Sequence, residues 1–352
     1  MNVYAYVSIL EVALKLLIVF LLKWITYDKL QLYGILYFSV VFVIAAIYRI
    51  YTRRNFEESK FLLVKDKKLF KTLISYSGWS LFGNIASVAK GQGVNILLNL
   101  YFGPTVNAAR GIAMQVQGAV NGFIYNFQLA VNPQIVKSYA TGDKEYLNSL
   151  ILRSSKFSFY LLIIISLPII LEVDQLLKFW LKIVPEYSSI FTILVLIVIM
   201  FDFVGGSLVA AVQATGKIKA YQILIGTLLV SILPLSYLFL EHGFSPEITL
   251  YINVVISIIA LAFRLYFVWR LIEFPVKIFL REVIFKNSII VPLSLSLPLI
   301  IRNSLDQNIL RLIIVILTSF ICNLLFIYVI GLNRSEKTFV LKMFNKILRK
   351  NE

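Results

Sequence analysis

Long apolar segments alternate with short polar ones along the whole chain. Each apolar segment has about the length that a helix needs to cross a bilayer, roughly 20 residues. The polar interruptions recur too regularly for one buried soluble core. The pattern predicts an all-α, polytopic membrane helical bundle of about ten transmembrane helices. The expected spans are Val3 to Leu22, Leu30 to Tyr48, Thr72 to Phe102, Val106 to Val131, Phe157 to Val173, Ile190 to Gln213, Tyr221 to Leu240, Ile248 to Trp269, Ser288 to Ile301 and Ile309 to Ile330.

The ninth span is the shortest of the ten, and Pro292 and Pro298 interrupt it. Because proline removes a backbone donor, we expect this span to be tilted or partly re-entrant. The composition agrees with the overall pattern, since 59% of the 352 residues are hydrophobic and only 15% are charged. Such a composition excludes an ordinary soluble domain.

Charge predicts the orientation of the bundle. The chain has 34 Lys and Arg against 18 Asp and Glu, a net charge of +16. The segments 49–71, 137–156, 215–220, 270–287 and 331–352 together hold 24 Lys or Arg, whereas the alternate connections hold 5. Cytoplasmic loops carry such an excess of positive charge. We therefore expect a multi-pass protein of the cytoplasmic (inner) membrane with its C-terminus in the cytoplasm, and no nucleic-acid partner.

The first span, the longest polar segment and the C-terminal tail each have an expected role. The first span carries Glu11 and Lys15 and lacks a basic segment before it, so we do not read it as a signal peptide. Residues 49–71 mix both signs of charge and are expected to form a cytoplasmic linker. In the tail, apolar residues from Phe339 to Leu348 recur at helical spacing between lysines and arginines, which predicts a helix lying on the anionic inner leaflet.

Polar side chains gather on one face of each of two neighbouring spans. In the third span the stripe contains Ser80, Asn84, Ser87, Gly91, Asn95 and Asn99, with Gln92 at its edge and Lys90 off the stripe. In the fourth span it contains Arg110, Gln117, Asn121, Gln128 and Asn132. Each residue either forms hydrogen bonds between helices or lines a water-filled path. As a set, the stripes favour a polar cavity. Gly111, Gly118 and Gly122 form an adjoining face of the fourth span that would let another helix approach closely.

Four charged residues inside spans are further candidates. Glu11 and Lys15 lie one helical turn apart and either neutralise each other or serve as coupling charges. Arg264 shares a face with Asn253 and Ser257; we expect it to extend towards the cytoplasmic interface, and otherwise to face the substrate path. Asp202 has no cation on its own helix and must pair across helices, be protonated or face water.

Most enzyme chemistry is disfavoured by the inventory of reactive side chains. The chain has one cysteine, Cys322, and one histidine, His242. Disulfide frameworks, Cys/His zinc sites and a His-paired nucleophile within one subunit are therefore nearly excluded. We expect no catalytic residue, no metal and no cofactor.

The stretch from Gly78 to Asp143 resembles bacterial polysaccharide exporters, the Wzx-type flippases of the MATE-like (multidrug/oligosaccharidyl-lipid/polysaccharide) exporter superfamily. The segments QGVNILLN, FGPTVNAARGIA, NFQLAVNPQIVKSYATGD, RSSKFSF, VPEY and QATGKIKAYQ carry the resemblance, which extends over most of the chain and weakens after about Arg270. Members of this family usually have about fourteen helices in two six-helix lobes with an additional C-terminal pair.

The resemblance implies a domain organisation. Residues 1–48 would be the last two helices of an N-lobe, 49–71 the linker, 72–270 a complete six-helix C-lobe, and 271–352 the C-terminal helix pair with its basic tail. Four N-lobe helices of the family have no counterpart in the chain, so this N-lobe is expected to be truncated. Because alternating access requires two bundles, we expect this chain to need those helices for transport.

The resemblance also implies a function. It predicts a transporter that flips undecaprenyl-diphosphate-linked oligosaccharide across the cytoplasmic membrane for O-antigen-type or capsule-type polysaccharide (lipopolysaccharide) biosynthesis, with lipids and other assembly proteins as partners. The amide stripes suit sugar hydroxyls, and Lys90, Arg110 or Arg264 suit a diphosphate. Alternatives are a cation-coupled multidrug exporter of the same fold, a membrane glycan polymerase or ligase, and an inactive remnant. Glu11 and Asp202 are the only acidic residues in the interior of the spans, which disfavours the multidrug exporter. The longest outer connection is 174–189, which disfavours the polymerase or ligase.

Overall fold

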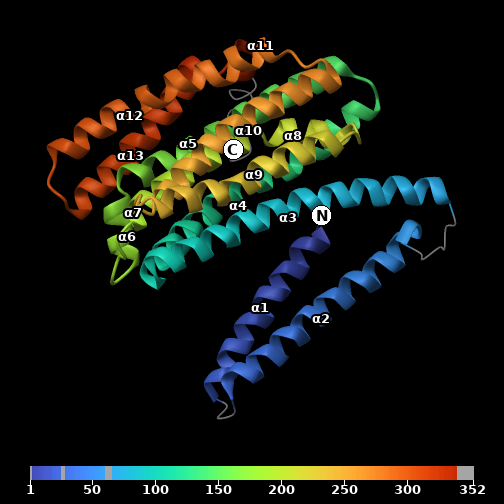
Figure 1. The fold of residues 1–352 in the computed structure, drawn as a ribbon, viewed down its shortest axis with the longest axis horizontal. Helices are drawn as coiled ribbons and strands as arrows, with labels where there is room; N and C mark the ends of the chain where they lie inside the picture. The colour runs from blue at the N-terminus through green and yellow to red at the C-terminus, as the bar shows by residue number, and fades with distance from the viewer. Residues whose placement is uncertain (1, 25–27, 60–65, 339–352) are drawn as a thin grey trace, which may run out of the picture. The chain divides into compact units, whose positions relative to one another are not determined.

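The computed structural model describes residues 2–24, 28–59 and 66–338, and all regular structure in these ranges is helical. The chain divides into two compact units, residues 1–70 and 71–352, called here the N-terminal and the C-terminal unit. In chain order (Figure 1) the elements are α1 (Asn2–Trp24), α2 (Lys29–Asn55), η1 (Glu57–Ser59), α3 (Lys67–Phe102), α4 (Pro104–Ala140), α5 (Lys144–Leu171), α6 (Val173–Trp180), α7 (Ser188–Val204), α8 (Gly206–Ala214), α9 (Lys219–Glu241), α10 (Ile248–Ile272), α11 (Val276–Phe279), η2 (Leu280–Phe285), α12 (Lys286–Ser304), α13 (Ile309–Phe326) and η3 (Ile327–Gly331).

The prediction of an all-α polytopic bundle is confirmed. Seven helical segments of the described chain are long and apolar enough to cross a membrane: Lys29–Asn55, Lys144–Leu171, Ser188–Ala214, Lys219–Glu241, Ile248–Ile272, Val276–Ser304 and Ile309–Gly331. Helices α1, α3 and α4 coincide with the other predicted spans and are not among the seven. In α3 and α4 the polar stripes lower the hydropathy. The count of ten spans therefore stays a prediction.

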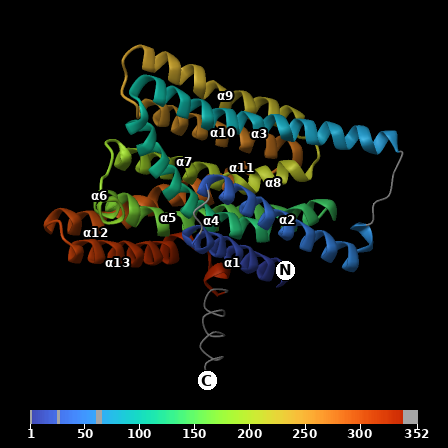
Figure 2. The same ribbon diagram turned by 90° about the horizontal axis from the view of Figure 1, so that it is seen from below.

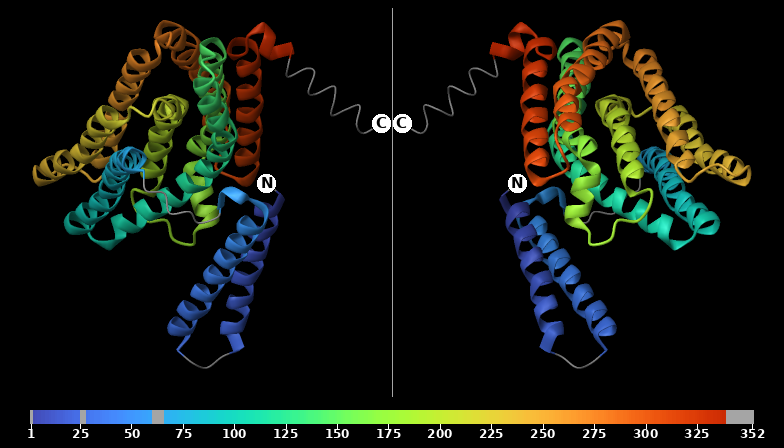
Figure 3. Two further views of the ribbon diagram at one scale, coloured as in Figure 1. Left: turned by 90° about the vertical axis from the view of Figure 1, so that its right-hand side faces the viewer. Right: turned by 90° about the vertical axis from the view of Figure 1, so that its left-hand side faces the viewer.

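The N-terminal unit is an antiparallel pair of helices, α1 and α2 (Figure 3). The Asp28 carboxylate caps α2 by accepting a hydrogen bond from the backbone N–H of Leu30 at 2.9 Å, which satisfies a donor that the first turn leaves free. Buried aliphatic side chains from both helices form the core of the pair. They are Val7, Ile18, Val40 and Ile44.

In the C-terminal unit, the hairpin of α3 and α4 presents both polar stripes. Gly103 joins the two helices with a φ of 79°, a conformation that favours glycine, and Pro104 begins α4. Helix α4 packs against α5, α7 and α8, and α10 packs against α7 and α9 (Figures 1 and 2). Buried residues of α3, α4, α7, α9 and α10 share one apolar cluster. The polar face of α4 is therefore attached to a well-packed scaffold, whereas α3 joins the cluster through Val94 and Leu98.

Glycines allow α3 and α9 to approach closely. A Cβ atom at Gly93 of α3 would meet the side chain of Leu233, and one at Gly226 of α9 would lie 2.6 Å from the ring of Phe82. By contrast, a Cβ atom at Gly111, Gly118 or Gly122 of α4 would meet nothing within 4 Å. The expected helix-contact face of α4 is open in the C-terminal unit, whereas the glycines of α3 and α9 form such a contact.

The ninth predicted span is longer and more regular than the sequence indicated. Residues Val276–Ser304 form one helical segment composed of α11, the π-helical η2 and α12, and it continues through Pro292 and Pro298. The expected loop 270–287 is therefore mostly helical. Hydropathy detects the apolar part of a helix, whereas backbone hydrogen bonding continues into its polar ends. For the same reason α5 begins at Lys144 rather than near Phe157.

The C-terminal helix pair packs on the rest of its unit through α5. Helices α12 and α13 lie side by side, and α13 contacts α5 along its length (Figure 1). Asn308 caps α13 by accepting a hydrogen bond from the N–H of Arg311 at 2.7 Å. The expected surface helix of the tail and part of the 49–71 linker lie outside the described residues.

Candidate functional site

Arg110 connects the two polar stripes. It lies two turns into α4, is 5% exposed, and reaches back across the hairpin to α3. Its Nη1 atom donates to Asn95 Oδ1 at 2.6 Å and to the carbonyl oxygen of Gly91 at 3.2 Å. Its Nε atom is buried without a partner. All acceptors of this guanidinium among the described residues are neutral, so its charge is not compensated by a direct ion pair.

Two further cations lie on other helices of the same unit. Lys90 of α3 donates through Nζ to Asn253 Oδ1 of α10 at 3.1 Å. Arg264 of α10 is 8% exposed, and its Nη2 atom lies 3.2 Å from Asp202 Oδ1 of α7. Arg264 does not extend towards the interface as expected, because the carboxylate across the bundle holds it inside. Of the three alternatives for Asp202, the structure shows the first, a partner on another helix.

These groups together carry an excess of positive charge. Lys90 and Arg110 donate hydrogen bonds to neutral acceptors, and Arg264 is paired with Asp202. Three cations and one carboxylate give these four residues a net charge of +2. A charge inside a membrane costs about 2.5–3.5 kcal/mol even on the mildest insertion scales. The excess of two positive charges would complement an anion. We call Lys90, Arg110, Asp202 and Arg264 the charged cluster.

Gln128, a member of the predicted α4 stripe, is turned into the helix packing. It is 7% exposed, and its Nε2 atom donates to Ser158 Oγ of α5 at 3.2 Å and to the carbonyl oxygen of Phe203 at 3.1 Å. Gly205 and Gly206, where α7 ends and α8 begins, make room for two of these polar side chains. A Cβ atom at Gly205 would lie 2.7 Å from Arg264 Nη1, and one at Gly206 would overlap the Gln128 amide.

Replacing Gly206 by valine is expected to destabilise the protein by about 1–3 kcal/mol, because the displaced Gln128 would lose both hydrogen bonds while its partners stay buried. The measurement is the thermal unfolding midpoint of the purified protein in detergent. Gly118→Ala is the matched control, since its new methyl group meets nothing within 4 Å and alanine is favoured over glycine in a helix. Equal midpoint losses in both variants would contradict the packing role of Gly206.

The other stripe residues remain available on the hairpin. Gln117, Asn121 and Asn132 are half-buried, and the side-chain oxygen of each lacks a hydrogen-bond partner. Asn84 and Asn99 of α3 are exposed. Unsatisfied amides in a membrane protein call for a polar ligand or water. The stripe thus supplies unsatisfied amide groups along the helix that carries Arg110.

Glu11 and Lys15 pair with each other in the N-terminal unit. Their side chains lie 2.6 Å apart along α1, and the Lys15 ammonium also stands 5.1 Å from the centre of the Tyr37 ring of α2. This arrangement is the mutual neutralisation that the spacing suggested. Their role as coupling charges stays a prediction.

Two buried ion pairs that sequence reasoning missed attach the C-terminal part of the chain to α5 and to Glu172, the residue that follows it. Arg311 Nη2 of α13 lies 2.8 Å from Glu172 Oε2, with side-chain exposures of 8% and 1%. Lys156 Nζ of α5 lies 2.7 Å from Glu336 Oε2, with 4% and 8%. For the first pair, the sequence offered one signal. Arg311 is a single charge near the start of an apolar run and therefore requires a partner. Its partner is 139 residues away in sequence and could not be identified from spacing.

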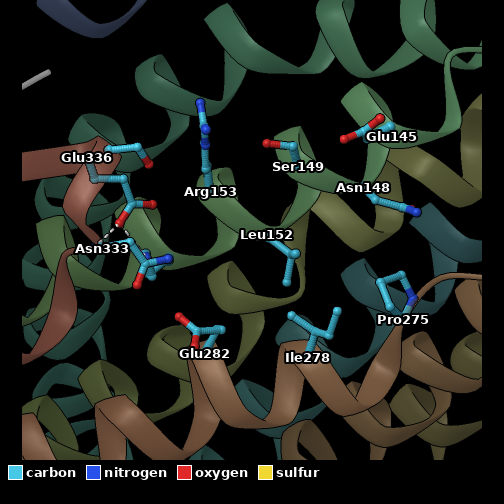
Figure 4. Close-up of a pocket in the computed structure, with 12 residues that line it drawn as sticks. Glu145, Asn148, Ser149, Leu152, Arg153, Pro275, Ile278, Glu282, Asn333 and Glu336 are labelled. Atoms are coloured by element: carbon cyan, nitrogen blue, oxygen red, sulfur yellow. Dashed lines mark hydrogen bonds and ion pairs between the residues drawn. The ribbon is translucent and has the colours of Figure 1, made fainter. Parts of the chain in front are cut away.

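Lys156 and Glu336 also line a pocket of about 390 Å³ (Figure 4). Its walls come from the first turns of α5, from Pro275 to Glu282, and from the segment after η3. Glu336 and Asn333 lie together at one end of the view, and Glu145 and Asn148 at the other. Nearby, a hydrogen bond from Lys144 lowers the pKa of the Glu273 carboxyl. Cations and carboxylates are mixed in this pocket, in contrast to the charged cluster.

The described residues contain no group of three His, Cys, Asp or Glu side chains arranged to hold a metal ion. Comparison of the chain with protein-family models, with curated proteins and with solved structures gave no match. The function therefore has to be inferred from the geometry of the charged cluster and from the sequence resemblance alone.

Proposed function

We propose that the protein is a membrane transporter that flips undecaprenyl-diphosphate-linked oligosaccharide across the cytoplasmic membrane for surface polysaccharide assembly, as the Wzx-type resemblance implies. The observation that carries this proposal is the net positive charged cluster inside the C-terminal unit. A diphosphate diester carries a negative charge on each phosphate, which complements the excess of two cations. Arginine and lysine donate charge-assisted hydrogen bonds to such oxygens.

The half-buried amides supply the second part of the recognition. Gln117, Asn121 and Asn132 each offer a carbonyl oxygen and an NH₂ group. Sugar hydroxyls both donate and accept, so an amide-rich face can bind them in several orientations. The same face is of little use to an apolar or cationic drug. A cation-coupled multidrug exporter remains the second candidate, and Asp202 is the carboxylate that would serve it.

Disrupting the gene in cells that make this protein tests the proposal. We expect surface polysaccharide to be lost and the lipid-linked oligosaccharide to accumulate in the inner leaflet. Reintroducing the intact gene should restore the polysaccharide, whereas a gene carrying Arg110→Met should not. Normal surface polysaccharide together with greater sensitivity to cationic drugs would contradict flippase activity and favour the multidrug exporter.

The predicted orientation is tested by labelling single cysteines in a Cys322→Ala background. The two sets of loops hold 24 and 5 Lys or Arg. Cysteines replacing Lys67 and Lys144 should therefore be cytoplasmic, and one replacing Gly243 should be external. The measurement is modification by a membrane-impermeant thiol reagent in intact and in permeabilised cells. Labelling of the Lys67 and Lys144 positions in intact cells would contradict the assigned orientation.

A further inference from the structure

An apolar cavity of about 290 Å³ lies within the C-terminal unit, apart from the charged cluster. Its walls come from α5, α7, α10, η2 and α12, through residues such as Phe159, Met200, Leu261 and Val291. These helices belong to four of the candidate spans, and Met200 lies 12 residues after the start of its span, Ser188–Ala214. None of the residues that line the cavity is charged. The cavity is thus a mid-membrane space suited to an uncharged molecule.

One polar side chain of the wall is not satisfied. Asn287 of α12 is 5% exposed, and both its Nδ2 and its Oδ1 atoms are buried without a hydrogen-bond partner. Burying an amide without partners is costly, and most such groups in folded proteins are paired. Leucine would fill the same space at no such cost. The amide therefore points to a ligand group that both donates and accepts a hydrogen bond.

The backbone next to Asn287 is specialised as well. The π-helical segment η2 ends at Phe285, two residues before Asn287, and π-helical turns are frequent at functional sites. Pro292 has no N–H group, so the carbonyl oxygen of Ser288 one turn earlier loses its usual donor. The hydroxyl of Ser288 is already used, because it donates to the carbonyl of Ile284. The acceptor in the wall that lacks a partner is the Asn287 Oδ1 atom.

The cavity reaches the surface of the unit along α12, where Ser288 and Pro292 are exposed. At about 30 Å³ for each water-sized group, its volume matches roughly ten such groups. We propose that this cavity binds an uncharged, lipid-soluble alcohol of about ten heavy atoms, or the hydroxyl-bearing end of a longer one. Its hydroxyl donates to an oxygen of the wall and accepts from the Asn287 NH₂ group, while its hydrocarbon body packs on Phe159, Met200 and Leu261.

Photolabelling of the full chain in lipid nanodiscs with a diazirine analogue of octan-1-ol tests this site. Mass spectrometry should locate adducts on the cavity residues, and decan-1-ol should compete with the probe better than decane does. Asn287→Leu is expected to reduce labelling about threefold to tenfold, the loss that one hydrogen bond produces. Ser288→Ala is the matched control and should label as the unchanged protein does, since its hydroxyl is bonded within its own helix.

A second variant, Val291→Phe, fills the cavity while leaving Asn287 in place and should abolish the adducts. It keeps the test valid if Asn287→Leu does not fold. Equal competition by decane and decan-1-ol, together with unchanged labelling of Asn287→Leu, would show an apolar void filled by lipid chains and would overturn the proposal. Adducts confined to residues outside the cavity would overturn it too.

Discussion

Replacing Arg110 by methionine is expected to weaken binding of a lipid-linked diphosphate oligosaccharide by roughly tenfold to a hundredfold. A charge-assisted hydrogen bond contributes about 1.5–3 kcal/mol, and 1.4 kcal/mol corresponds to a factor of ten. Like Lys90, Arg110 donates only to neutral acceptors among the described residues. Its guanidinium can therefore turn to an anion without breaking an ion pair.

The measurement is equilibrium binding of a fluorescent short-chain diphosphate glycolipid to the purified protein in detergent. Arg110→Lys should retain most of the binding, because the charge remains. Arg302→Met is the matched control, since Arg302 lies near the end of α12 and outside the cluster. The same loss of binding in both methionine variants, or equal affinity for a neutral glycolipid, would contradict recognition of the diphosphate by the cluster.

Replacing Arg311 alone by methionine is expected to destabilise the protein by about 3–5 kcal/mol, because Glu172 would be left as an uncompensated buried charge. The double variant Glu172→Gln, Arg311→Met should recover most of this loss. Replacing both members of a buried ion pair by neutral groups is often nearly neutral. The measurement is the midpoint of unfolding by sodium dodecyl sulfate, followed by circular dichroism.

The exposed pair of Lys144 and Glu273 provides the comparison, with side-chain exposures of 71% and 81%. Solvent screens such a pair, so Lys144→Met should leave the unfolding midpoint unchanged. If the double variant at Glu172 and Arg311 were as unstable as Arg311→Met alone, the attachment of α13 to α5 would depend on side-chain shape rather than on the balance of charge.

Periodicity alone identified the helices and the polar faces of α3 and α4, because a 3.6-residue repeat is a local property of the chain. It also showed that Asp202 required explanation. It could not identify Arg264 as the partner, since that choice depends on how α7 and α10 pack. For the same reason, periodicity could not identify Arg311 as the partner of Glu172.

Hydropathy was a poorer guide to helix ends and to the role of single stripe residues. Helix α5 begins twelve or more residues before its apolar run, because backbone hydrogen bonds do not require apolar side chains. Gln128 has the spacing of Arg110 and Gln117, yet it faces α5 and α7 because Gly206 leaves room for its amide. The Gly205–Gly206 dipeptide was the available signal in the sequence.

We expect the polar face of the α3–α4 hairpin to line a water-filled path. The decisive measurement is the reactivity of single cysteines towards a water-soluble thiol reagent, in a Cys322→Ala background. Cysteines replacing Gln117, Asn121 and Asn132 should react rapidly. Cysteines replacing the apolar Phe123, which is 66% exposed and expected to face lipid, and the buried Gln128 should not. Equal reactivity at all five positions, or inert cysteines throughout the stripe, would contradict the path and leave the amides as contacts between helices.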